Sequence, residues 1–200
     1  MKILMLSHYF HPHLGGVEKH LTKLSQELIK DGHEITILTS QHQPDLPLQE
    51  TISGIKVVRL PLKKVKFFGL LHLWWQLLKK LVWLRQFELI HIHDVFIWFL
   101  PMRFLLPFKP VFMTFHGYIQ SPISLKEKLI GRLAAFLTRG KICVGDFIPR
   151  HFGFKAEAVI YGAQSNWRDA RAATKSEAEL KYDALFIGRF APQVGIHLYL

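Results

Sequence analysis

Short apolar runs alternate along the chain with segments whose apolar residues recur at helical spacing. Residues 2–7 (KILMLS) form an apolar run with few polar interruptions, which is typical of a strand buried on both faces. Residues 17–30 place apolar side chains three or four positions apart, as one face of a helix does. Residues 34–40 (EITILTS) are rich in β-branched side chains. This order predicts a βαβ unit with parallel strands and a right-handed connection.

The same alternation continues through most of the chain. We expect further strands at 54–60, 88–93, 110–117, 141–145 and 156–162, and further helices at 69–86 and 126–139. A proline-interrupted apolar segment ends near residue 106. Strands alternating with helices predict an α/β fold, a doubly wound and mostly parallel Rossmann-like sheet.

The composition changes after this series and suggests a domain boundary. We expect residues 1–165 to form the Rossmann-like domain and the polar residues 166–183 to form a linker. Residues 184–200 then start a new strand and turn, as the beginning of a second, truncated domain.

Two adjacent glycines, Gly15 and Gly16, connect the first strand to the first helix. A helix N-terminus carries unpaired N–H groups and about half a positive charge, and residues without a Cβ let a phosphate come close. The alternative is a tight turn that needs a positive φ. The fingerprint G-x-G-x-x-G is absent, and no acidic residue follows the second strand to hold a ribose, which disfavours a nucleotide-dependent oxidoreductase.

Several histidines are candidates for chemistry. His116 ends a predicted strand, where ligands of open α/β sheets bind, although a hydrogen bond to neighbouring backbone would also explain it. His91 and His93 alternate along a strand and so share one face. Together with Asp94 they resemble a set of metal ligands. The single cysteine, Cys143, excludes an internal disulfide and suits a reducing compartment.

Positive charge is concentrated in one part of the chain. The net charge is +11, and residues 51–87 contain eight basic residues and no acidic one. On a helix, residues 70–85 present an apolar arc roughly 200° wide, about twice what a core-facing helix needs. Trp74, Trp75 and Trp83 add amphipathic anchors. These features predict contact with an anionic membrane surface through residues 56–85, with burial between neighbouring helices as the alternative.

Other partners and locations fit less well. We expect no nucleic-acid binding, because no groove-reading helix or aromatic platform motif is present. The N-terminal apolar run is too short for a signal peptide, and no uncharged stretch approaches the roughly 20 residues of a membrane span. The expected location is therefore cytoplasmic, with a possible peripheral position on the inner face of the membrane.

Segments along the whole chain resemble the family 4 glycosyltransferases, which are retaining enzymes with the GT-B fold. The opening of the chain is followed in order by FELIHIHD (87–94), VFMTFHG (111–117), KICVGDFIPRHF (141–152), VIYGAQ (159–164) and LFIGRFAPQVGI (185–196). The resemblance implies the N-terminal, acceptor-side half of a GT-B enzyme, whose second domain mainly holds the nucleotide-sugar. It also implies metal-independent transfer from a UDP- or GDP-sugar to a lipid-linked or other glycan acceptor.

The same resemblance assigns roles to individual residues. Gly15 and Gly16 would contact the diphosphate of the donor, and His116 would act as a catalytic residue beside the donor sugar. Arg189 matches the arginine that neutralises the departing diphosphate. His91 and His93 match a structural motif of the family, so the resemblance implies that they and Asp94 do not bind a metal.

The chain departs from the family pattern at several positions. Val194 replaces an expected lysine, Tyr161 and Gln164 replace the asparagine and aspartate around Gly162, and the family's Glu-x7-Glu element would lie beyond Leu200. We therefore expect a fragment, or a half-enzyme that needs a partner chain to supply the second domain. The alternative is a non-catalytic subunit that binds an acceptor or a membrane.

Overall fold

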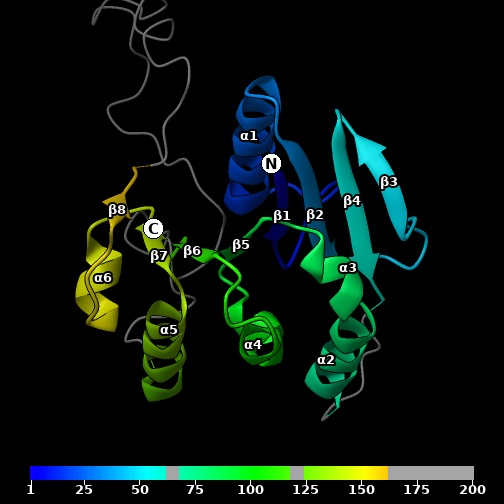
Figure 1. Ribbon diagram of the computed structural model, residues 1–200. Coiled ribbons are helices and arrows are strands. Elements are labelled where there is room, and N and C mark those ends of the chain that lie inside the picture. Colours follow the sequence, from blue (N-terminus) through cyan, green and yellow to red (C-terminus); the bar gives the residue numbers. More distant parts are fainter. Residues whose placement is uncertain (62–67, 118–123, 162–200) are drawn as a thin grey trace, which may run out of the picture.

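A mostly parallel eight-stranded sheet forms the centre of the fold (Figure 1). The computed structural model describes residues 1–61, 68–117 and 124–161. The strands are β1 (Lys2–Leu6), β2 (Glu34–Ser40), β3 (Gln49–Ile52), β4 (Ile55–Leu60), β5 (Leu89–His93), β6 (Val111–Phe115), β7 (Gly140–Cys143) and β8 (Ala158–Val159). The helices are α1 (Gly16–Lys30), α2 (Gly69–Lys79), α3 (Leu81–Arg85), α4 (Phe96–Leu105), α5 (Leu125–Leu137) and α6 (Phe147–Phe152).

The order of the strands reverses direction at β1. The spatial order is β3-β4-β2-β1-β5-β6-β7-β8, and every neighbouring pair is parallel except β3 with β4. The chain thus builds one half of the sheet from β1 outward through β2 and β4. It then returns to the other side of β1 and continues through β5 to β8. Such a reversal is the place where open α/β sheets bind ligands, outside the carboxyl ends of the strands. The predicted doubly wound α/β fold is confirmed.

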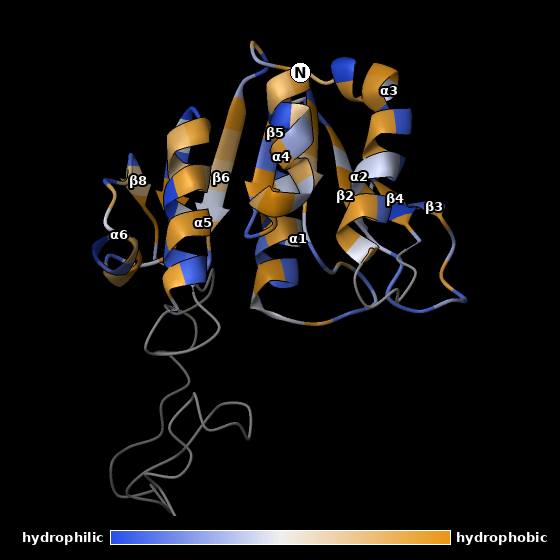
Figure 2. Ribbon diagram, turned by 90° about the horizontal axis from the view of Figure 1, so that it is seen from below, coloured by the Kyte–Doolittle hydropathy of each residue, from blue (hydrophilic) through white to orange (hydrophobic). Residues whose placement is uncertain are grey.

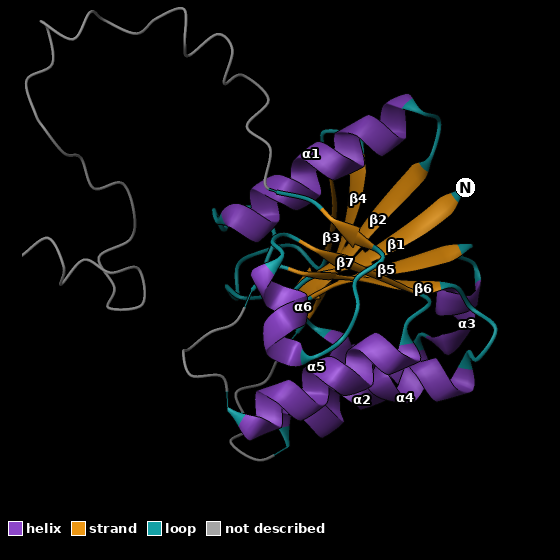
Figure 3. Cartoon of the chain, turned by 90° about the vertical axis from the view of Figure 1, so that its left-hand side faces the viewer, coloured by secondary structure: helices purple, strands orange, loops and turns teal. Residues whose placement is uncertain are grey.

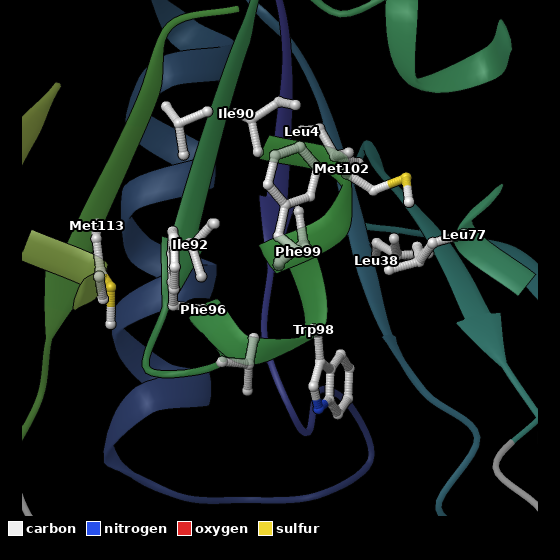
Figure 4. Packing of buried hydrophobic residues seen from close by; sticks show 14 of the residues in the cluster. Leu4, Leu38, Leu77, Ile90, Ile92, Phe96, Trp98, Phe99, Met102 and Met113 are labelled. Atoms are coloured by element: carbon white, nitrogen blue, oxygen red, sulfur yellow. The ribbon is translucent and has the colours of Figure 1, made fainter. Parts of the chain in front are cut away.

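Helices cover both faces of the sheet and bury its central strands (Figure 3). Strand β1 shows the consequence, because Ile3 and Met5 belong to the core cluster beneath α1 while Leu4 and Leu6 belong to the opposite cluster. That larger cluster joins the sheet to α2 and α4, and Figure 4 shows Phe99 and Met102 of α4 packed among side chains of β1 and β5. Burial on both faces explains why the central strands are nearly continuous apolar runs.

The elements differ from the sequence-based expectation in five places. The helix expected over 69–86 is two helices, because the chain leaves helical geometry at Lys80 (φ −97°, ψ 12°), although no proline or glycine marks this position. The proline-interrupted apolar segment contains helix α4, and strand β3 and the short helix α6 were not expected at all. The last expected strand, 156–162, is reduced to the two residues of β8. The linker and the start of a second domain lie outside the described residues.

A proline inside α4 explains how α2 and α4 are joined. Pro101 has no N–H, so the carbonyl of Ile97, four residues earlier, cannot receive its usual helical hydrogen bond. The indole Nε1–H of Trp74 donates to this carbonyl at 2.9 Å. Trp74 therefore faces the core, and the expectation that it acts as a membrane anchor is wrong. A residue on α2 satisfies a backbone acceptor that the sequence of α4 leaves free.

The Trp74–Ile97 hydrogen bond can be tested with a double-mutant cycle. Trp74→Phe should lower the free energy of unfolding by about 1–3 kcal/mol, because it leaves a buried carbonyl without a donor. In a Pro101→Ala background, residue 101 regains an N–H that can donate to the carbonyl of Ile97. Trp74→Phe should then lower the free energy of unfolding by about 1 kcal/mol less than it does in the unsubstituted protein. Urea denaturation measures both values, and Trp83→Phe provides a matched control. Equal costs in the two backgrounds would contradict this explanation of the contact.

Candidate functional site

The first turn of α1 is open at the carboxyl end of β1. Gly15 is the N-cap residue, its backbone is extended (φ −153°, ψ 180°), and no side chain caps the helix. The alternative explanation of the glycine pair, a turn with positive φ, is therefore wrong. Gly16 is exposed, and a Cβ at this position would meet nothing within 4 Å. The first-turn N–H groups that lack a helical partner thus have no capping side chain, and Gly16 adds no side chain of its own to this surface.

Gly15 has a different role from Gly16. A Cβ on Gly15 would lie 2.3 Å from Oε2 of Glu18, so a side chain at this position would displace that carboxylate. Glu18 is buried, and its Oε1 lies 3.1 Å from Nδ1 of His13. The pair Gly15–Gly16 therefore combines a close internal contact with an open, side-chain-free surface.

The loop that precedes α1 is fixed by residues of neighbouring strands. The carbonyl of His8 accepts hydrogen bonds from the hydroxyls of Thr39 and Ser40 at the end of β2. The guanidinium of Arg59, on β4, donates to the carbonyl of His11 at 2.7 Å and to that of Pro47 at 2.9 Å. These bonds hold the loop at the edge of the sheet where the parallel strands end.

Arg59 corrects one expectation from the sequence. Its side chain is fully buried, and Nη2 lies 2.5 Å from Oε1 of Glu50. Arg59 therefore belongs to the interior and cannot contact a membrane, although it lies within the predicted basic segment 56–85. Lys63, Lys64 and Lys66 of that segment lie outside the described residues.

Histidines from three elements meet next to the open turn of α1. His93 ends β5, His116 follows β6, and His20 lies on α1, one helical turn or about 6 Å beyond Gly16. Nδ1 of His93 lies 3.0 Å from Nε2 of His116, and the ring of His20 is centred 5.1 Å from that of His116. The register of the parallel strands places His93 opposite Thr114, so the two strand ends are level.

Three further contacts fix this histidine cluster, which we define as His20, His91, His93 and His116. Nε2 of His91 is 2.8 Å from the hydroxyl of Thr114, and the rings of His91 and His93 are centred 4.3 Å apart on one face of β5. The N–H of His116 donates to Oδ1 of Asp94 at 2.9 Å, and Asp94 has a positive φ of 59°. His91 and His93 are thus held within the sheet by contacts with neighbouring side chains.

Burial keeps the clustered histidines neutral. It lowers the pKa of His91 to about 4 and that of His116 to about 3, with a smaller contribution from neighbouring histidines. It also lowers the pKa of His20 and holds that of His93 well below its usual value. Asp94 is partly exposed, yet desolvation by surrounding atoms raises its pKa to about 7 against the effect of the His116 N–H. The site therefore presents neutral imidazoles and backbone dipoles at neutral pH.

The structure brings together some of the predicted site residues. Gly16 and His116 flank His20, whereas Arg189 lies outside the described residues. His20 was missed, although its position four residues after Gly16 was a usable signal.

The trio His20, His93 and His116 places three ligand-capable nitrogens within 4.8 Å of one another, a different set from the His91, His93 and Asp94 considered from the sequence. Two of these nitrogens already contact each other. A hollow of about 730 Å³ lies elsewhere, between α5 and β7.

Comparison with known proteins agrees with this architecture. A family model of Glycosyltransferase Family 4 matches residues 14–152, which include the open turn of α1 and the histidine cluster. The chain belongs to Glycosyltransferase Family 4. This family membership confirms the resemblance found in the sequence.

Two curated relatives of this family 4 chain act on phosphatidylinositol lipids, according to their names. One subunit of the human phosphatidylinositol N-acetylglucosaminyltransferase is 44% identical over 61 residues, which are 30% of this chain and 13% of the human protein. The phosphatidyl-myo-inositol mannosyltransferase of Mycolicibacterium smegmatis is 29% identical over 150 residues, which are 67% of this chain and 38% of that protein. The chain therefore spans well under half the length of these relatives.

A solved structure shows the same fold. Sucrose-phosphate synthase from Thermosynechococcus elongatus superposes with a TM-score of 0.61 at 15% identity, over 86% of this chain and 51% of that chain. Among the described residues of the family 4 chain, no helix is long and apolar enough to cross a membrane.

The neutral histidines predict how stability depends on pH. An unfolded histidine takes up a proton near pH 6.5, whereas folded His91 does so only near pH 4. Between these values the unfolded state binds more protons, so the free energy of unfolding should fall as pH falls, by about 1.4 kcal/mol per pH unit for such a histidine. Asp94 has the opposite effect on stability. Because its pKa is raised in the folded state, the folded state takes up this proton at a higher pH than the unfolded state does, which increases the free energy of unfolding as pH falls.

Single variants separate these contributions. His91→Gln should flatten the decline between about pH 7 and about pH 5, because it removes one histidine that resists protonation when folded. Gln86→Ala, which removes an exposed side chain that does not titrate, should leave the slope unchanged. Urea denaturation at a series of pH values measures the slopes, and an unaltered slope for His91→Gln would contradict the assignment.

Proposed function

We propose that this chain is the acceptor-side half of a glycosyltransferase that uses a UDP- or GDP-sugar as donor. The open N-terminus of α1, one turn from a cluster of neutral histidines, is the observation that carries the proposal. The acceptor would be a lipid-linked or other glycan hydroxyl. The names of the two curated relatives, which both specify transfer to phosphatidylinositol lipids, support a glycolipid acceptor.

The first turn of α1 would contact the diphosphate of the donor. Its unpaired N–H groups and about half a positive charge favour an anion, and the absence of a side chain on Gly16 lets phosphate oxygens approach the backbone. The carboxylate of Glu18 does not occupy this surface, because it is buried beneath Gly15 and contacts His13. Gly16 would thus contact the donor directly, and Gly15 would shape the turn.

His116 would donate a hydrogen bond to the donor sugar. Nε2 of His93 is buried and has no hydrogen-bond partner among the described residues, so it is best left without a proton. The proton of His93 then lies on Nδ1, which donates to Nε2 of His116. His116 in turn carries its own proton on Nδ1, and this N–H remains for a ligand. The assignment of these protons follows from the network rather than from observed hydrogens.

The transfer itself would be promoted by fixed dipoles and charges. The bond between the sugar carbon and the diphosphate breaks as a bond to the acceptor oxygen forms, and the acceptor proton leaves with the diphosphate. The dipole of α1 would stabilise the negative charge that develops on this leaving group. Arg189 and a second domain, carried by the remaining chain or by a partner chain, would supply the other contacts.

A substitution at Gly16 tests the diphosphate contact. Gly16→Val should weaken donor binding, with a rise in the KM for the nucleotide-sugar on the order of tenfold or more, because the side chain would occupy the space proposed for phosphate. The fold should be unaffected, since nothing lies within 4 Å of a Cβ at this position. Transfer or hydrolysis assayed with a panel of UDP- and GDP-sugars measures the effect.

A matched control is available in the same loop. Leu14→Val changes an exposed side chain and should leave the KM unchanged. An unchanged KM in Gly16→Val would contradict the diphosphate contact. If the unsubstituted protein uses no donor of the panel, the rival function, a non-catalytic acceptor- or membrane-binding subunit, is favoured. The replacement of an expected lysine by Val194 supports that rival.

Metal dependence provides a separate prediction. We expect transfer to continue in the presence of EDTA, because Nδ1 of His93 and Nε2 of His116 are already engaged with each other. Activity that is lost in EDTA and restored by a divalent cation would contradict this expectation and would identify His20, His93 and His116 as the first ligands to test.

A further inference from the structure

Large hydrophobic side chains are exposed mainly on one side of the sheet. Most of those exposed among the described residues lie on or beside α2, α3, α4 and α5, and none lies on α1, which covers the opposite face. Figure 2 views the molecule from the side of α2, α4 and α5, and hydrophobic positions recur along each of these helices. The residues concerned, here called the apolar face, are Phe68, Leu70, Leu71, Trp75, Leu78, Val82, Phe104, Leu105, Phe108, Leu125, Leu129, Leu133 and Phe136.

Helices α2 and α3 carry two apolar stripes on opposite sides. Leu73, Leu77 and Leu84 are buried against the core. Trp75 and Val82, which lie on the outward stripe with Leu71 and Leu78, are 56% and 73% exposed. A helix that only covers a sheet needs one such stripe. The wide apolar arc predicted from the sequence is therefore divided between the core and the outer surface.

Helix α5 has its large hydrophobic residues on the wrong side for a helix that only covers a sheet. Small residues, Gly131, Ala134 and Ala135, face the interior. Leu129 is 57% exposed and Phe136 is 84% exposed, while polar residues would normally occupy such positions. The outer surface of α5 is thus a second apolar stripe.

The two stripes belong to one surface. Helix α4 lies between α2 and α5 on the same side of the sheet (Figures 1 and 2). Phe104 at its C-terminal end is 66% exposed, and Phe108 just beyond it is 98% exposed. Exposed apolar patches of this extent are unusual on soluble monomers and mark a binding surface.

Charge indicates what this surface contacts. Residues 51–145 contain fifteen lysines and arginines and only three acidic residues. Lys79 and Arg85 of α2 and α3 and Lys126 and Arg132 of α5 are all exposed. Nζ of Lys79 lies 5.0 Å from the centre of the Trp75 ring, which places a cation beside the most exposed tryptophan of the described residues. Tryptophan with flanking cations is the composition of elements that lie in an anionic membrane interface.

We propose that the apolar face rests on the surface of an anionic phospholipid bilayer. Leu, Phe and Trp side chains of α2, α3, α4 and α5 enter the interface, and the surrounding lysines and arginines contact lipid phosphates. The surface is wider than the segment 56–85 suggested by the sequence, because α5 and the end of α4 belong to it. It excludes Arg59 and Trp74, which are engaged inside the fold.

Membrane binding rests on the proposed function in one respect only: the membrane would carry the lipid-linked acceptor. Binding to a bilayer requires neither donor nor turnover. Failure of membrane binding would therefore leave the glycosyltransferase proposal standing, and failure of transfer would leave the membrane proposal standing.

Flotation with vesicles tests the proposal directly. The protein should float with vesicles of phosphatidylcholine and phosphatidylglycerol and much less with phosphatidylcholine alone. The double variants Trp75→Gln/Val82→Gln and Leu129→Gln/Phe136→Gln should each reduce the bound fraction on the order of tenfold or more. Leu48→Gln, at an exposed residue before β3, should not change it.

Other outcomes would overturn the proposal. Absence of flotation with either vesicle, or flotation that neither double variant reduces, would show that the apolar face does not bind lipid. Self-association in analytical ultracentrifugation that both double variants abolish, without flotation, would assign the face to a second copy of the chain. Circular dichroism of each variant checks whether the fold is retained.

Discussion

The reversal of strand order at β1 is the constraint on which the rest of the structure depends. Because β1 pairs with β2 on one side and with β5 on the other, the connections after β1 and β5 leave the sheet in different directions. Open α/β sheets bind ligands at such a point, outside the carboxyl ends of the strands. The turn before α1 lies at this edge, and His93 and His116 reach it from β5 and β6. Residues far apart in the sequence meet here because of topology alone.

The electrostatics of the site follow from the same arrangement. Placing His91 and His93 on the buried face of β5 removes them from water, and His20 of α1 covers them from above the sheet. The result is a group of neutral imidazoles beside a helix N-terminus, a setting that provides hydrogen-bond donors and a positive dipole without an added charge. On the opposite side of the sheet, α2, α4 and α5 complete the core with part of their apolar surface and leave the remainder outside. The proposed catalytic and membrane functions thus use different faces of one sheet.

Local patterns predicted much of this fold, because strands buried on both faces are recognisable as apolar runs and α1 has clear helical spacing. The glycine pair was also located correctly at the start of the first helix, and His116 directly after a strand. What the sequence did not reveal depends on distant partners. Arg59 looks like a surface cation until its partners His11, Pro47 and Glu50 are known, and Trp74 looks like an interfacial anchor until Pro101 frees the carbonyl of Ile97. The close packing of the Glu18 carboxylate against Gly15 is likewise visible only in the structure.

The central claim is that the first turn of α1 binds the diphosphate of a nucleotide. Titration of ¹⁵N-labelled protein with uridine or guanosine diphosphate, followed by NMR, tests it most directly. The account predicts that the largest amide shift changes occur at Gly15, Gly16 and Val17, with smaller changes at His116. Shift changes confined to another part of the chain, or none at millimolar nucleotide, would contradict it.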